Sequence, residues 1–117
     1  MVYRTALLAA LLSLSLLSGC AHQLDEAAGA LLGAWTEPVP GQPGRVQGFE
    51  LEADGSARSV NMATLQYERW RLQDGALVLE GKSIGNGLTI PFTETLRIER
   101  LTDKTLVTDR AAYQRAP

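Results

Sequence analysis

The segment VQGFELEADGSA, residues 46–57, decides the fold class of this chain. Apolar Phe49 and Leu51 alternate there with two glutamates, which is the pattern of a β-strand with one buried and one solvated face. The Asp54-Gly55 pair that follows predicts a tight hairpin turn, because glycine adopts positive φ without steric cost. The segment therefore predicts two antiparallel strands joined by a short turn.

Short strand-like segments, separated by turn residues, occur on both sides of this hairpin. We expect strands at residues 32–36, 46–53, 56–62, 65–73, 76–82 and 88–98, followed by two more around Leu106 and Tyr113. Turn signals separate them, among them a second Asp-Gly pair at residues 74–75 and a glycine-rich loop at residues 83–87. About eight short strands with no long helix predict an all-β fold, an antiparallel sandwich or a small barrel. Because the strands are short, we expect a mostly filled core with a small pocket at one end.

The strand at residues 65–73 contains an irregularity. Its apolar parity shifts between Tyr67 and Trp70, which predicts a β-bulge or a bend. A hairpin folded at the 74–75 turn pairs positions whose numbers sum to about 149. Tyr67 is therefore expected opposite Lys82.

The N-terminal residues have the order of parts of a secretory signal peptide: a basic start at Arg4, 12 apolar residues from Ala6 to Leu17, and a small-residue stop. At about 1.5 Å per residue this stretch covers about 18 Å of a hydrocarbon core of roughly 30 Å, so it does not predict a membrane-spanning helix. We expect a signal peptide at residues 1–19, a tether at residues 20–30 with one or two helical turns, and a barrel domain at residues 31–117.

The four residues Leu17-Ser18-Gly19-Cys20 resemble the lipobox of bacterial lipoproteins. The resemblance implies cleavage between Gly19 and Cys20, a diacylglyceryl thioether on Cys20, and a further acyl chain such as palmitate on its amino group. Two acyl chains already hold a protein stably on a membrane, because each buried CH₂ contributes about 0.8 kcal/mol. Alanine at position 21 implies, by similarity to sorting in Gram-negative bacteria, an anchor in the outer membrane with the domain facing the periplasm.

Charge argues against one class of partner. Loss of Arg4 with the signal peptide leaves ten basic and thirteen acidic side chains, a mildly acidic balance. Without a basic stripe to neutralise phosphates, the chain is not expected to bind nucleic acid. The remaining 98 residues suit one domain, which we expect to be a monomer.

Two short passages resemble the lipocalins. Gly33-Ala34-Trp35 matches the G-x-W of their first strand, and Arg115 matches the basic residue of their last strand that packs across this tryptophan. Together with residues 47–57, 61–70 and 81–87, they make the chain similar to small bacterial lipocalin-like (calycin-type) lipoproteins. The resemblance implies a lipocalin-like barrel closed by Gly33, Trp35 and Arg115, with Arg110 as the alternative partner of Trp35.

The chain has few side chains suited to catalysis. His22 and Cys20 are the sole histidine and cysteine, so zinc sites and Ser-His or Cys-His nucleophiles are not expected. Glu68 and Glu80 could be paired carboxylates, but their pattern is typical of a solvated face beside basic residues. We therefore expect no enzyme, no metal and no cofactor.

A polar, uncharged set lies near the expected strand ends and has two interpretations. It comprises Asn61, Thr64, Tyr67, Ser83 and Asn86. One interpretation is a rim that binds a ligand or a partner. The other, which we favour, is turn chemistry, with Asn and Ser satisfying backbone groups while Gly85 and Gly87 supply positive φ.

The sequence thus favours a membrane-anchored, non-enzymatic lipocalin-like lipoprotein that binds a small apolar ligand or an envelope protein. The alternative is a periplasmic inhibitor or accessory lipoprotein that acts on a cell-wall hydrolase through the 83–87 loop. An open cavity would favour a ligand, whereas a filled interior would favour a protein partner.

Overall fold

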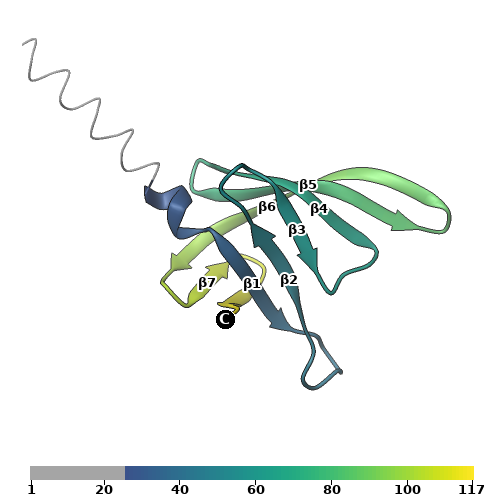
Figure 1. Ribbon diagram of the computed structural model, residues 1–117, viewed down its shortest axis with the longest axis horizontal. Helices are drawn as coiled ribbons and strands as arrows, with labels where there is room; N and C mark the ends of the chain where they lie inside the picture. Colours follow the sequence, from purple (N-terminus) through teal and green to yellow (C-terminus); the bar gives the residue numbers. More distant parts are fainter. Residues whose placement is uncertain (1–25) are drawn as a thin grey trace, which may run out of the picture. The chain divides into compact units, whose positions relative to one another are not determined.

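The computed structural model describes residues 26–117 of the chain (Figure 1). The expected signal peptide, the lipidation residue Cys20 and His22 lie outside the described residues. Residues 26–30 are helical, and residues 31–117 form a separate compact unit. That unit contains eight strands: β1 Gly33–Pro38, β2 Val46–Leu51, β3 Ala57–Val60, β4 Leu65–Gln73, β5 Ala76–Gly85, β6 Leu88–Leu101, β7 Thr105–Thr108 and β8 Ala112–Arg115. In the part of the chain described, no helix is long and apolar enough to cross a membrane.

The strands form one antiparallel meander that bends into a nearly closed barrel. Their order is β3-β2-β1-β8-β7-β6-β5-β4, so that β1 pairs with β8 and the seam lies between β3 and β4. A bridge between Ser56 and Arg69 and a hydrogen bond of 3.0 Å from the Trp70 N–H to the Gly55 carbonyl cross this seam. The predicted all-β antiparallel barrel is confirmed.

Side chains fill the barrel interior. Alternate residues of every strand point inward, as the pleat requires. Eight side chains have less than 2% of their surface exposed, namely Leu31 just before β1 and the strand residues Trp35, Phe49, Leu51, Leu77, Leu79, Leu96 and Leu106. Burial of this apolar set is the main contribution to stability, at about 25 cal/mol for each Å² removed from water.

The predicted bulge in β4 is present, and it corrects the expected register. Pairs sum to 149 from the hairpin turn as far as Arg69 and Glu80, and then the ladder shifts. Glu68 is the extra residue, so Tyr67 lies opposite Gly81 and not opposite Lys82. A bulge places two residues against one, which moves every later partner by one position.

The segment expected as a loop at residues 83–87 is mostly strand. β5 continues to Gly85, and a two-residue turn at Asn86-Gly87 leads into β6. Asn86 and Gly87 have φ of 52° and 73°, as in hairpin turns of the Asn-Gly type, whereas Gly85 has no positive φ. The β5–β6 hairpin therefore extends beyond its neighbours as an arm, defined here as residues 83–90 (Figure 1).

Gly48 provides a test of how tightly the barrel bends. It lies in β2 opposite Thr36, and a Cβ placed on it would overlap the Trp35 carbonyl oxygen. We expect Gly48→Ala to lower the free energy of unfolding by about 1–3 kcal/mol, as overpacking does. Gly85→Ala is the matched control, since a Cβ there meets nothing within 4 Å. Equal denaturation midpoints for the two variants would contradict this account.

Candidate binding site at the open end of the barrel

One end of the barrel is closed by Trp35 and Arg115. The indole N–H donates to the Leu31 carbonyl at 2.9 Å, and the Arg115 guanidinium lies 4.2 Å from the ring centroid. Arg115 also donates to the carbonyls of Leu32 and Asp103, the latter at 2.6 Å. Gly33 leaves room for this guanidinium, because a Cβ at its position would lie 2.7 Å from Nη1. Arg115 therefore makes the stacking contact, whereas Arg110 is exposed.

The other end of the interior carries two tyrosine–glutamate pairs. The Tyr67 hydroxyl donates to Glu94 at 3.1 Å, and the Tyr113 side chain lies near the Glu37 carboxylate. Burial, together with the nearby carboxylates, raises the pKa of both tyrosines well above the usual value, so both remain neutral donors. Both glutamates are half-buried. The end opposite Trp35 is thus polar and open to solvent.

Four aromatic rings form the floor beneath these carboxylates. Phe49 contacts Tyr67 and Tyr113 edge-on, with ring centroids 5.9 Å and 5.0 Å apart. Phe92 packs on Tyr67 at 5.7 Å. Such contacts between rings contribute about 0.5–1.5 kcal/mol each beyond their area. The floor is a fixed platform between the filled core and the open end.

The inner face of β6 leads from this floor out along the arm. Phe92 and Glu94 share that face with Ile90 and Leu88, because successive even positions of a strand point the same way. Ile90 and Leu88 are 56% and 62% exposed, the largest values among the exposed large apolar side chains of the described residues. An apolar stripe therefore runs from the open end into solvent.

Comparisons with known proteins identify this architecture. A family model described as Lipocalin-like matches residues 27–116. The chain belongs to this family. It is also similar to the crystal structure of a lipocalin-like protein from Bacteroides thetaiotaomicron, with 49% sequence identity, a TM-score of 0.69, and coverage of 74% of this chain and 97% of that chain. A search of curated proteins finds no match.

The polar residues singled out in the sequence have different roles in this lipocalin-like barrel. Asn61 has φ of 55° and donates its side-chain amide to the Val46 carbonyl at 2.8 Å, which ties the end of β3 to β2. Asn86 forms the arm turn, and Tyr67 points into the interior. Thr64 and Ser83 lie near each other, since the Thr64 carbonyl accepts from the N–H of the residue after Ser83 at 2.7 Å. The two asparagines thus have the geometry of turn residues.

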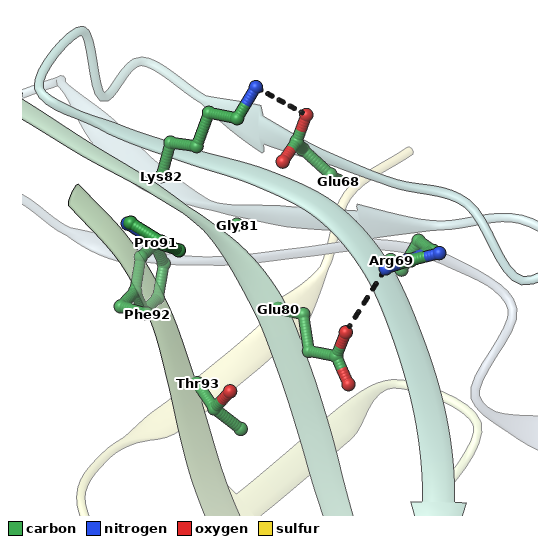
Figure 2. A pocket seen from close by; sticks show the side chains of 8 residues that line it. All are labelled: Glu68, Arg69, Glu80, Gly81, Lys82, Pro91, Phe92 and Thr93. Atoms are coloured by element: carbon green, nitrogen blue, oxygen red, sulfur yellow. Dashed lines mark hydrogen bonds and ion pairs between the residues drawn. The ribbon is translucent and has the colours of Figure 1, made fainter. Parts of the chain in front are cut away.

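A hollow of about 290 Å³ lies on the outer face of β4–β6 (Figure 2). Its charges neutralise one another: Glu68 pairs with Lys82 at 3.6 Å, and Arg69 pairs with Glu80 at 3.5 Å. Exposed pairs of this kind contribute little energy and stay hydrated. The face is the solvated one expected for Glu68 and Glu80, and we do not assign it as the site.

Two residues of the open end were missed in the sequence, namely Glu37 and Glu94. Both could have been found from strand alternation, because alternate residues of a strand share one face. Glu37 follows the inward Trp35 by two residues, and Glu94 lies midway between the inward Phe92 and Leu96. An acidic residue at an inward position of a strand is the signal that would have found them.

The closed end of the barrel yields a prediction about Arg115. We expect Arg115→Ala to lower the free energy of unfolding by about 1–3 kcal/mol, because the cation–π contact and the bonds to two carbonyls are lost together. Arg110→Ala is the control and should change it by less than about 0.5 kcal/mol. Urea denaturation followed by tryptophan emission measures both. Equal losses in the two variants would mean that the Trp35 stacking is not specific.

Proposed function

We propose that this lipocalin-like protein is a non-enzymatic binding protein, held on a bacterial outer membrane by lipid on Cys20, that binds a small apolar ligand at the open end of its barrel. The observation that carries the proposal is the exposure of Leu88 and Ile90 on the strand face that leads to the aromatic floor. Covering two such side chains favours binding by about 1.5–3 kcal/mol for each one fully buried.

The filled interior by itself favours a protein partner over an enclosed ligand, so the ligand proposal rests on the exposed apolar stripe outside the core. Side chains occupy the space that would hold a ligand in a deep calyx. A ligand at this end would lie outside the core, along the exposed apolar side chains on the inner face of β6. A small, partly exposed ligand fits this shape better than a fully enclosed one.

The anchor has its own test. Native mass spectrometry of the full chain extracted from bacterial membranes should show a protein that begins at Cys20 and carries diacylglycerol and palmitate. Cys20→Ser should abolish the lipid adducts and move the protein out of the membrane fraction. A wild-type mass that begins elsewhere or lacks lipid would exclude the anchor, while leaving the binding proposal to the next experiment.

Ligand binding is tested with the fluorescent apolar probe N-phenyl-1-naphthylamine. We expect the fluorescence of the probe to increase when the wild-type protein is added. Ile90→Ser should weaken the apparent affinity for the probe about threefold to tenfold, because the apolar stripe loses its central side chain. Thr89→Ser is the matched control, since Thr89 is exposed on the opposite face of the same strand. Equal affinities for both variants would exclude the arm as the site.

The projecting arm also favours a second candidate, an envelope protein such as a cell-wall hydrolase. A two-stranded hairpin with Asn86-Gly87 at its tip can enter a cleft of another protein. Wild-type protein that gives no probe signal but slows lysis by lysozyme would favour this candidate over ligand binding.

A further inference from the structure

The apolar stripe of β6 ends at a pair of carboxylates that have no basic partner. On the barrel exterior, glutamates such as Glu50 and Glu80 pair with arginine within 3.5 Å. The ion pairs among the described residues include neither Glu37 nor Glu94. Glu94 accepts from the Tyr67 hydroxyl, and Glu37 lies near Tyr113. Arg110 affects the pKa of Tyr113 but forms no ion pair with either carboxylate. Two negative charges therefore face the open end uncompensated.

Aromatic rings adjoin these carboxylates. Tyr67 and Tyr113 each bring a ring beside one carboxylate, and Phe49 lies between the two rings. The tyrosine rings are themselves buried, so the half-buried carboxylates are the groups that a ligand can reach. A cationic head group forms charge-assisted hydrogen bonds with these carboxylates. A neutral or anionic head group would cover the carboxylates without pairing them, which costs free energy.

The geometry of β6 also fixes where an apolar chain would lie. Leu88, Ile90, Phe92 and Glu94 are successive residues on one face of the strand. At about 3.3 Å per residue the stripe from Glu94 to Leu88 is about 20 Å long. A charged head group held at Glu94 would thus place an extended alkyl chain along Phe92, Ile90 and Leu88.

We propose that the open end selects a cationic amphiphile, with its ammonium group between Glu37 and Glu94 and its apolar chain along the inner face of the arm. This inference rests on the proposed function and names the chemistry of its ligand. The charge complementarity of the two carboxylates selects the cation, and the exposed stripe selects the chain.

The experiment compares three amphiphiles of equal chain length below their micelle concentrations: dodecylammonium, dodecyl maltoside and dodecanoate. Isothermal titration calorimetry uses residues 20–117 with Cys20→Ser, without detergent, because the barrel unit has a core of its own. We expect dodecylammonium to bind at least tenfold more tightly than the other two. The preference should weaken as salt is added, because exposed charges are screened.

Variants locate the preference. Glu37→Gln combined with Glu94→Gln should reduce it at least fivefold while dodecyl maltoside binds as before. Glu50→Gln, which removes an exterior carboxylate, should leave it unchanged. Equal binding of all three amphiphiles by the wild-type protein would overturn the cationic selectivity and leave apolar binding standing. Binding of none of them would overturn both proposals.

Discussion

The pairing of β1 with β8 is the constraint on which the rest of the structure depends. Without this pairing, β1–β3 and β4–β8 would be two separate sheets with four open edges. The pairing joins them into one sheet whose two remaining edges, β3 and β4, meet at the seam. Here the pairing also sets Trp35 opposite Arg115, so the ring is covered by a cation that is itself bound to backbone carbonyls. One end of the barrel is closed by this arrangement.

The same register explains why the open end is polar. With Trp35 opposite Arg115, the next inward pair along the two strands is Glu37 and Tyr113. Tyr67 and Glu94 face them from β4 and β6. The Tyr67 hydroxyl satisfies Glu94, a carboxylate that would be costly to bury unpaired. The aromatic floor thus lies between the apolar core and the carboxylates of the open end.

Alternation and turn residues predicted most of the fold, because both act locally. The strand predicted at residues 65–73 has the same bounds as β4, and the change in apolar alternation after Tyr67 predicted the bulge. The sequence did not predict the consequence of the bulge, because a register is a relation between two strands. Asn86-Gly87 was interpreted as part of a loop, although these residues form a two-residue turn that lets β5 and β6 grow into the arm. The open-end carboxylates were missed because acidic residues were assumed to face solvent, an assumption that fails wherever a tyrosine can pair with them.

One edge of β6 has no strand partner along the arm in the pairings described, and Pro91 lies on that edge. The backbone N–H and carbonyl of Arg97 point toward β7, where Asp109 bonds to both. The β5–β6 register has no shift between Leu88 and Arg97. In an antiparallel pair, the backbone N–H and carbonyl groups of alternate residues point toward and away from the partner strand. Because Arg97 points away from β5, Pro91 also points away from it. Among the strand pairings described, β6 has no partner on that side before Ile98. Proline has no N–H to offer there and interrupts the edge for any added strand. The arm therefore exposes Leu88 and Ile90 beside a strand edge that resists edge-to-edge association with other chains.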